Sequence, residues 1–309
     1  MKILVTGARG FIGSVLCQIG RENGHKMVGL DDFSRGLNDN PCIDFDCRSG
    51  VAAIFDEFTS VNSEPPFDAV VHLAAGTGSL SRPYEELIEL NLEMTKKIYF
   101  DCLKFKIPTF VFPTTSLVEG VPDSPYVRSK QDAMDWLIGR NDNINIIPLQ
   151  FYNVTGAYKD FSEIRKLEVH IVPIMLECFM KHVPFVINGS DYDTVDGTPG
   201  RDFSNVIDVS QFILHLINVQ NQSPFKSDKV IKVGTGQITT AKHMVDMFNI
   251  WAEPKFKREL DFRIGPVRPY DCGWLRCDQP YLHIFKKPTD IFTSLVDELN
   301  TLAKKVYNV

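Results

Sequence analysis

Residues 2–13 read KILVTGARGFIG, and this stretch predicts the fold of the first half of the chain. Residues 2–6 form a short apolar run of the kind found in buried parallel strands. Gly7, Gly10 and Gly13 follow at once, and they open a helical pattern over 11–23. Glycines at such a turn let the backbone bend sharply and approach a pyrophosphate, while the helix N-terminus presents N–H groups to the phosphates. The stretch is therefore typical of a dinucleotide-binding unit.

The rest of the first half repeats this alternation of strand and helix. Apolar runs rich in Val, Ile, Leu and Phe predict strands at 27–30, 43–45, 69–73, 109–112 and 144–149. Helical patterns lie between them, at 51–58, 84–105 and 125–140. Such alternation predicts a doubly wound α/β domain of the Rossmann type, with a parallel sheet covered on both faces. We place this domain at 1–152.

The second half has a more mixed pattern. A helix is expected at 171–181, a short strand at 185–187, a polar, turn-rich segment at 190–200 and a further helix at 206–219. We predict a smaller mixed α/β lobe at 153–309 that binds the substrate, completed by 230–233, 240–251 and 292–306. Residues 204–220 are expected to return to the first sheet, and a cleft should separate the two lobes.

Composition excludes several classes of protein. The chain has 309 residues, of which 44% are hydrophobic and 23% charged, which is ordinary for a globular protein and rules out a disordered or collagen-like chain. A net charge of −6 gives no basic surface for nucleic acid. No apolar run approaches the ~20 residues of a membrane span, and the N-terminus lacks a signal-peptide pattern. Seven cysteines without metal-type spacing predict no metal site and a reducing, cytoplasmic location.

Asp31 indicates which dinucleotide is bound. It stands at the end of the second predicted strand, where an acidic side chain hydrogen-bonds the hydroxyls of the adenosine ribose. Its charge would repel the 2′-phosphate of NADP, which favours NAD. Arg35 is a feature that points the other way, since its guanidinium could pair with that phosphate.

Tyr126 and Lys130 carry the predicted chemistry. They are four residues apart in the helical pattern at 125–140 and therefore share one face of the helix. A Lys ammonium near the Tyr hydroxyl, together with a positive nicotinamide ring, favours the phenolate and lowers the pKa of the phenol from its usual value near ~10. A phenolate can take a proton from a sugar hydroxyl while hydride leaves the same carbon for NAD. The spacing is common by chance, so its place after a nucleotide-binding turn and a hydroxyl-rich strand end carries the inference.

With these motifs, almost the whole chain resembles the extended short-chain dehydrogenase/reductase family, and within it the UDP-hexose 4-epimerases. The matching motifs are the three glycines, the acidic turn at 31–36, Asp-Cys-Arg at 46–48, the strand at 67–75 and the Asn of the next helix. By this resemblance the NAD-binding residues are Gly7, Gly10, Phe11, Ile12, Gly13, Asp31, Asp32, Ser34, Asp46, Cys47, Leu73, Ala74, Ala75, Asn91 and Lys130.

The end of the fifth strand supplies a catalytic hydroxyl in this family. Counting back from Gly120 aligns Thr115 with that hydroxyl, and Ser116 is the reserve candidate one position later. Both are also expected to contact the substrate, together with Tyr126. Dehydratases and decarboxylases of the family carry acidic residues just after the catalytic Thr, where this chain has Ser116 and Leu117. Without a carboxyl group there, elimination of water is disfavoured.

The second lobe carries motifs for a nucleotide sugar. Asn153, in Phe-Tyr-Asn-Val-Thr-Gly at 151–156, resembles the Asn that contacts the phosphates, although holding a turn is an equally good reading of it. The loop at 189–203, with its Asp-Tyr-x-Thr-x-Asp-Gly-Thr core, resembles the 4-epimerase form and ends near Arg201. Arg268 and Asp271 resemble the family's Arg-x-Gly-Asp. The resemblance implies that both arginines bind the diphosphate and that Asp271 reaches the uridine ribose.

Three departures from the family concern the sugar pocket. The segment between Ala75 and Asn91 is about two residues shorter than usual, which reshapes the loop near the nicotinamide. Five residues separate Gly120 from Tyr126, where epimerases have a much longer loop over the sugar. Glu119 and Tyr270 replace the family's Tyr and Gly.

The sequence favours an NAD-dependent epimerase acting on a nucleotide-diphosphate sugar, with a UDP-hexose as substrate and transient oxidation at C4. One alternative is a nucleotide-sugar reductase or dehydrogenase on the same scaffold, and another is a binding protein without catalytic activity. The helical patterns at 84–105 and 125–140 suggest a four-helix interface and hence a homodimer, as in the family.

Overall fold

A computed structural model describes residues 1–59, 64–77, 82–121, 123–164, 170–223, 229–269 and 271–309. Within these residues seven parallel strands form one sheet, in the order β11-β6-β5-β4-β1-β2-β3. The strands are β1 (Lys2–Thr6), β2 (Lys26–Asp31), β3 (Ile43–Asp44), β4 (Ala69–His72), β5 (Thr109–Thr115), β6 (Asn145–Phe151) and β11 (Ile231–Val233). The order reverses direction between β1 and β4, the point at which such sheets bind ligands beyond the strand ends. The predicted fold class is confirmed.

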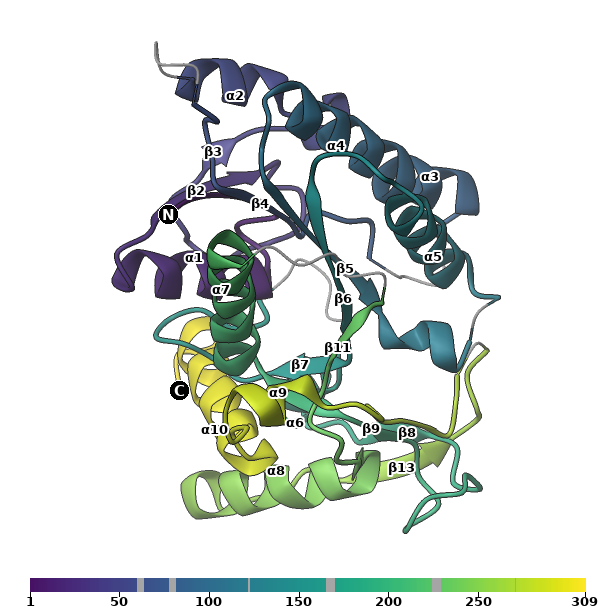
Figure 1. Ribbon diagram of the computed structural model, residues 1–309. Helices are drawn as coiled ribbons and strands as arrows, with labels where there is room; N and C mark the ends of the chain where they lie inside the picture. The colour runs from purple at the N-terminus through teal and green to yellow at the C-terminus, as the bar shows by residue number, and fades with distance from the viewer. Residues whose placement is uncertain (60–63, 78–81, 122, 165–169, 224–228, 270) are drawn as a thin grey trace.

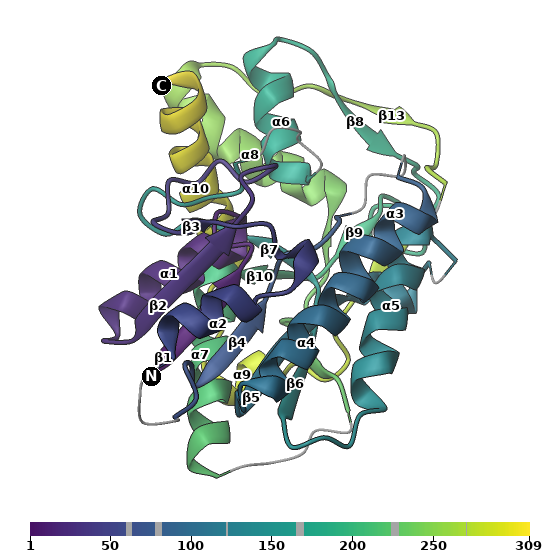
Figure 2. The same cartoon turned by 90° about the horizontal axis from the view of Figure 1, so that it is seen from above.

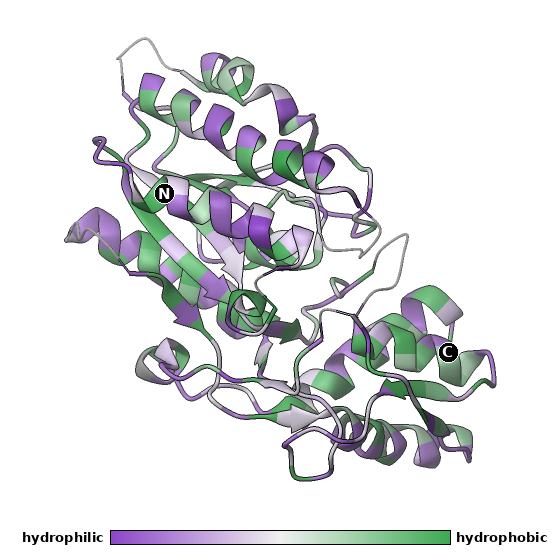
Figure 3. Ribbon diagram, turned by 90° about the vertical axis from the view of Figure 1, so that its right-hand side faces the viewer, coloured by the Kyte–Doolittle hydropathy of each residue, from purple (hydrophilic) through white to green (hydrophobic). Residues whose placement is uncertain are grey.

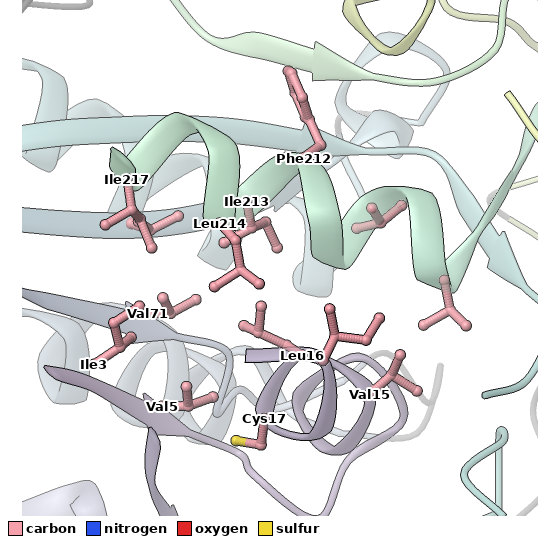
Figure 4. Close-up of a cluster of buried hydrophobic side chains, with 14 of the residues drawn as sticks. Ile3, Val5, Val15, Leu16, Cys17, Val71, Phe212, Ile213, Leu214 and Ile217 are labelled. Atoms are coloured by element: carbon pink, nitrogen blue, oxygen red, sulfur yellow. The ribbon is translucent and has the colours of Figure 1, made fainter. Parts of the chain in front are cut away.

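Helices cover both faces of the sheet (Figures 1 and 2). Helices α1 (Phe11–Glu22) and α7 (Val206–Gln222) lie on one face, and α2 (Ala52–Phe58), α4 (Met94–Lys104) and α5 (Pro125–Ile138) on the other. Alternate residues of β1 point to the two layers: Ile3 and Val5 contact the α1–α7 layer, and Leu4 contacts the other. Figure 4 shows Ile3, Val5 and Val71 facing α1 and α7, and the strands are correspondingly apolar in Figure 3. Burial on both faces explains why the strands are continuous apolar runs.

The predicted helix at 84–105 contains a π-helical turn. Helix α3 (Tyr84–Ile88) leads into the π turn η2 (Glu89–Glu93), which leads into α4. A π turn inserts one residue into the helical register and rotates the side chains that follow. A second π turn, η4 (Ala303–Tyr307), ends the chain after α10 (Ile291–Leu302). Short 3-10 turns occur at η1 (Cys47–Ser49) and η3 (Ser116–Glu119).

The second lobe has its own core, in which α6 (Ile171–Met180), α8 (Ala241–Phe256) and α10 contribute most of the buried side chains. Its strands, among the described residues, form small sheets: β10 (Phe203–Asn205) with β7 (Asn153–Thr155), β13 (Phe262–Gly265) with β8 (Phe185–Asn188), and β9 (Gly200–Arg201) between β12 (Thr239–Thr240) and β14 (Trp274–Leu275). In Figure 1 these elements lie below the main sheet.

One element assigned to the second lobe belongs elsewhere. Residues 230–233 were expected to complete the smaller lobe, but β11 pairs in parallel with β6 and forms the edge of the main sheet. Short apolar runs of this kind look alike in either lobe, so this correction depends on strand pairing. Helix α7 packs against α1, and α9 (Tyr281–Phe285) contacts α7 and β11. Strand β11 and helix α7, both from the second half of the chain, therefore complete the first sheet and one of its helical layers.

Across the described residues, none of the helices is long and apolar enough to cross a membrane.

Candidate active site

A cavity of about 920 Å³ lies between the two lobes, beyond the carboxyl ends of the main strands. The predicted residues that line it are Gly7, Gly10, Phe11, Ile12, Gly13, Asp31, Asp32, Ser34, Asp46, Cys47, Leu73, Ala74, Ala75, Thr115, Ser116, Tyr126, Lys130, Asn153, Arg201, Arg268 and Asp271. They come from both halves of the chain, so the fold brings the cofactor motifs and the substrate motifs to one space.

The glycine turn is shaped to hold a phosphate group. Gly7 has a φ of +71°, and a Cβ there would lie 2.8 Å from the backbone nitrogen of Ala74. A Cβ on Gly13 would lie 2.2 Å from the carbonyl oxygen of Gly7. Helix α1 begins after Gly10, which supplies no side-chain cap, and its first turn has no acidic residue. Its first N–H groups and its positive dipole end therefore suit the pyrophosphate of a dinucleotide. This cradle fits NAD.

Asp31 is held in place at the end of β2. Its Oδ2 accepts a hydrogen bond from the backbone N–H of Arg9 at 2.9 Å, and Oδ1 accepts one from Phe33 at 2.9 Å. Burial raises the pKa of this carboxyl group, whereas the two backbone donors favour its charged form. A carboxylate oxygen can accept from more than one donor, so Oδ1 and Oδ2 of Asp31 can each still accept from a ribose hydroxyl. Arg35 also lines the cavity and donates to the carbonyl of Thr77 at 3.5 Å.

Tyr126 and Lys130 project from the first turns of α5. Ser124 caps this helix by accepting from the N–H of Val127 at 3.2 Å, which sets where the helix begins. Lys130 is 4% exposed, and its Nζ lies 4.4 Å from the centre of the Phe112 ring. Burial lowers the pKa of Lys130 to about 7. The ammonium is thus held in a site where its charge is costly without an electron-rich partner.

Thr115 is the last residue of β5 and the N-cap of the turn η3. Its Oγ1 accepts from the backbone N–H of Leu117 at 3.3 Å, which leaves the hydroxyl hydrogen to be donated elsewhere. Ser116 is buried, and both hydroxyl residues line the cavity. The structure brings both candidates to the site and does not separate their roles.

Asn91 does not touch the cavity that the described residues form. It lies in the π turn and is 1% exposed. Its Oδ1 accepts from the N–H of Gly76 at 2.8 Å, and its Nδ2 donates to the carbonyl of Gly76 at 3.1 Å and to Ser129 Oγ at 2.8 Å. Ser129 in turn donates to the carbonyl of Tyr126 at 2.8 Å. The contact of Asn91 with the cofactor stays a prediction; in the structure its side chain connects the loop after β4 with the helix that carries Tyr126.

A buried histidine extends this connection to the first strand. His72 Nε2 lies 3.1 Å from Thr95 Oγ1, and the Thr95 hydroxyl donates to the carbonyl of Asn91 at 2.6 Å. Thr95 must then accept from Nε2–H, so Nδ1 accepts from the hydroxyl of Thr6 at 2.7 Å. Thr6 accepts in turn from the N–H of Ala74 at 3.1 Å. Burial lowers the pKa of His72 to about 3, consistent with a neutral ring.

The second lobe supplies two arginines that are already oriented. Arg201 Nη2 lies 2.6 Å from Asp271 Oδ1, and Nη1 donates to the carbonyls of Gly200 at 2.8 Å and Cys272 at 3.1 Å. With the Asn188 amide assigned so that its oxygen faces Arg268, that oxygen accepts from Arg268 Nε at 2.8 Å and Nη2 at 2.9 Å. Two planar cations on one wall suit a diphosphate, because a guanidinium can bind phosphate oxygens with two parallel bonds.

Asn153 begins β7 and lines the cavity, and a residue from the C-terminal helix supports the turn after it. Glu298 Oε2 accepts from Thr155 Oγ1 at 2.5 Å and from the N–H of Gly156 at 2.9 Å. Glu298 is fully buried. Tyr270, which replaces the family's Gly, lies outside the described residues.

Sequence reasoning did not single out several lining residues. Asn188 ends β8 beside Arg268, and a search for polar residues at strand ends would have found it. His170 precedes helix α6, with Nδ1 3.3 Å from Glu163 Oε2, and its position before a predicted helix was a usable signal. In the described ranges there is no group of three or more His, Cys, Asp or Glu residues that could hold a metal ion.

Comparisons with known proteins agree with this geometry. The family model "NAD dependent epimerase/dehydratase family" matches residues 3–234. The UDP-glucose 4-epimerase of Corynebacterium glutamicum is 28% identical over 80% of this chain and 79% of its own length, and that of Caenorhabditis elegans is 25% identical over 90% of each.

Solved structures share the fold. A UDP-glucose 4-epimerase from Stenotrophomonas maltophila, with bound NAD and formylated UDP-arabinopyranose, superposes with a TM-score of 0.87 at 20% identity over the full length of both chains. One from Bifidobacterium longum, in complex with NAD+ and UDP, gives 0.83 at 21% identity over 99% of each.

Proposed function

Because the chain belongs to the NAD dependent epimerase/dehydratase family, we propose that it interconverts a UDP-hexose and its C4 epimer. The observation that carries the proposal is the convergence on one cavity of the glycine turn, the Tyr126–Lys130 pair and two arginines. The Corynebacterium and Caenorhabditis relatives named above, both UDP-glucose 4-epimerases, support the choice of reaction.

Residues of the first domain hold the cofactor. The turn at Gly7–Gly13 and the N-terminus of α1 hold the pyrophosphate, Asp31 binds the adenosine ribose, and Asp46 and Cys47 lie at the adenine end. Bound there, NAD would supply a reversible hydride acceptor for oxidation and re-reduction at the sugar C4. The reaction thus ends without net oxidation.

Tyr126 moves the proton that accompanies this change. Its phenolate takes the proton from the C4 hydroxyl on oxidation and gives it back on reduction. Lys130 supplies the positive charge that favours the phenolate, and burial makes that charge effective because little water screens it. Thr115 donates its free hydroxyl hydrogen to the reacting oxygen, with Ser116 as the reserve candidate.

Residues of the second lobe bind the nucleotide. Arg201 and Arg268 bind the diphosphate, Asn153 contacts its phosphates, and Asp271 both orients Arg201 and reaches the uridine ribose. The sugar itself has fewer protein contacts, so it can turn between the two hydride transfers while the diphosphate stays bound.

The direct test is product analysis by NMR. The purified protein is incubated separately with UDP-glucose, UDP-galactose and their N-acetyl counterparts, without added cofactor. We expect the same equilibrium mixture of C4 epimers from either member of a pair. Stoichiometric consumption of NAD or NADH would identify a dehydrogenase or reductase, and loss of water or carbon dioxide would place the protein in another branch of the family.

We also propose a homodimer formed through α4 and α5. Phe100 of α4 is 49% exposed, and the guanidinium carbon of Arg140 lies 5.6 Å from its ring centre and 5.0 Å from that of Trp136 of α5. An exposed aromatic and cationic surface of this kind suits a two-fold interface. Sedimentation velocity should give a mass near twice 35.0 kDa, and Phe100→Asp should give a monomer. A monomeric unmodified protein would exclude this assembly.

A further inference from the structure

Glu119 joins the ends of three strands of the main sheet. It is the last residue of η3, the turn that follows Thr115. Its Oε1 accepts from Nε2 of Gln150 in β6 at 2.8 Å and lies 2.6 Å from Nζ of Lys232 in β11. Its Oε2 accepts from the hydroxyl of Tyr152, directly after β6, at 2.9 Å. We call Glu119, Gln150, Tyr152 and Lys232 the strand-end clamp.

The clamp continues the sheet where backbone pairing ends. The β5–β6 register ends at the pair Thr115 and Phe151, and the β6–β11 register pairs Gln150 with Lys232. Beyond Thr115 the chain enters η3, and beyond Phe151 it enters Tyr152 and Asn153. Glu119 thus connects η3 with the segment that follows β6. Turn η3 comes directly after Thr115, the proposed catalytic hydroxyl, and the segment after β6 contains Asn153, a predicted phosphate contact.

All three partners of Glu119 are hydrogen-bond donors, which suits an acceptor at position 119. Burial opposes the charge on Lys232, but hydrogen bonds to Asp278 and Glu119 raise its pKa overall. Burial and the bond to Glu119 both raise the pKa of Tyr152, which keeps its hydroxyl a donor. A carboxylate can accept from three donors at once, and bonds that involve a charged group are the stronger kind.

The resemblance places Tyr at the position of Glu119, and a Tyr there would have no carboxylate to accept from three donors. The same chain has a short connection between Gly120 and Tyr126. A Cβ on Gly120 would lie 2.8 Å from Sγ of Cys272, so the turn is also packed tightly from the other side.

We propose that Glu119 is a positioning residue, which holds η3 and Thr115 in register with Tyr152 and Asn153 so that the reacting sugar oxygen meets Thr115 and Tyr126. The proposal rests on the proposed epimerase function. Glu119 does not line the cavity among the described residues, so it acts through Tyr152 and the turn. Its removal should reduce turnover much more than nucleotide binding, because Arg201 and Arg268, the proposed diphosphate ligands, belong to the other lobe.

The first experiment compares Glu119→Gln, Tyr152→Phe, the double variant and Asp278→Asn. Each single clamp variant should lower kcat about tenfold, which corresponds to about 1.4 kcal/mol. The double variant should lose little more, because both substitutions break the same bond. The inhibition constant of UDP should stay within about twofold. Asp278 pairs with Lys232 from an exposed position, so its variant is the matched control and should keep full turnover.

The second experiment measures hydrogen–deuterium exchange in the unliganded protein. Peptides covering residues 109–121 should exchange faster in Glu119→Gln and Tyr152→Phe than in Asp278→Asn. This readout does not depend on activity, so it separates failure of the clamp from failure of the epimerase assignment. Unchanged exchange in the clamp variants, an unchanged kcat, or an equal loss in the control would each overturn the proposal.

Discussion

Tyr126 and Lys130 lie one helical turn apart, and the reactivity predicted for them depends on burial. Their spacing places both on the face of α5 that meets the cavity. Lys130 is buried beside Phe112, and no ion pair with a carboxylate is seen for it among the described residues, so its charge is available to a phenolate and to the substrate oxygen. The pair therefore depends on position, since a surface Tyr and Lys at the same spacing would be screened by water.

Replacing Tyr126 by Phe should abolish most turnover while leaving the fold intact. The ring is kept, and the acid–base hydroxyl is lost, so kcat should fall by about 10²–10⁴-fold. NAD retention and the melting temperature should match those of the unmodified protein. NMR assays of epimerisation measure kcat, and calorimetry measures the melting temperature. A variant with near-normal turnover would remove Tyr126 from the mechanism.

The hydroxyl that assists Tyr126 can be assigned by two parallel variants. Thr115→Val keeps the shape of the side chain and removes the donor, so it should lower kcat less than Tyr126→Phe, by about tenfold. Ser116→Ala should change kcat by less than about threefold. If the Ser116 variant were the more impaired of the two, the catalytic hydroxyl would be Ser116.

Lys130 should make the stability of the cofactor-free protein depend on pH. Burial lowers its pKa to about 7 in the folded state, whereas the unfolded value is near ~10.4. Between these values the unfolded chain binds more protons, so the contribution of Lys130 to the free energy of unfolding rises with pH from about 7 to about 10. Urea unfolding across this range should show a rise that Lys130→Met lacks. Parallel curves for the two proteins would contradict a buried, charge-destabilised lysine.

At the scale of elements, the loop after β4 and the helix α5 are joined by buried side chains of the η2–α4 segment. The bonds run from Ala74 through Thr6, His72 and Thr95 to Asn91, and from the Asn91 side chain to Gly76 and Ser129. Ser129 then bonds the carbonyl of Tyr126. The loop after β4 and helix α5 therefore share one satisfied hydrogen-bond network, of the kind that favours a single arrangement.

Asn91→Asp tests whether this residue is structural. An Asp keeps the size of the side chain but places an acceptor against Ser129 Oγ and the Gly76 carbonyl, so the free energy of unfolding should fall by about 2–4 kcal/mol even without cofactor. Chemical denaturation of the cofactor-free protein measures this. A variant with normal stability and weakened NAD affinity would instead support the original prediction of a direct cofactor contact.

At the scale of the whole molecule, the two lobes supply different groups to the cavity. In the proposed mechanism the first domain would provide the glycine turn and the reacting side chains, and the second would provide the arginines for the substrate; residues of both line one cavity. Because groups from both lobes line one cavity, relative placement of the lobes sets the distance between the diphosphate and Tyr126. Small displacements of this kind are costly in catalysis.

Arg201→Ala and Arg268→Ala should each raise KM for the UDP-sugar about 10- to 100-fold with little change in kcat, because they bind the ground state and the transition state alike. Arg201→Ala should also reduce stability, since Asp271 loses its partner. Arg276, which does not line the cavity among the described residues, supplies the control Arg276→Ala with unchanged KM. Steady-state kinetics that showed a fall in kcat alone would contradict this division.

The sequence by itself determined the local features of this protein. The glycine turn, Asp31, the Tyr126–Lys130 pair and the order of strands and helices are set by backbone sterics and by periodicity, which short stretches of sequence carry. These features were enough to predict a doubly wound sheet, the NAD cofactor and most of the residues that line the cavity.

The tertiary structure alone decided which long-range partners meet. It placed β11 at the edge of the main sheet and buried the Asn91 side chain against Gly76. It also paired Arg201 with Asp271. Finally, it brought Glu119 to Gln150, Tyr152 and Lys232. The sequence does not indicate which partner a polar side chain will bind, because burial and strand register across the chain determine that partner. For that reason the bonds of Asn91 to Gly76 and Ser129 could not be predicted from the sequence.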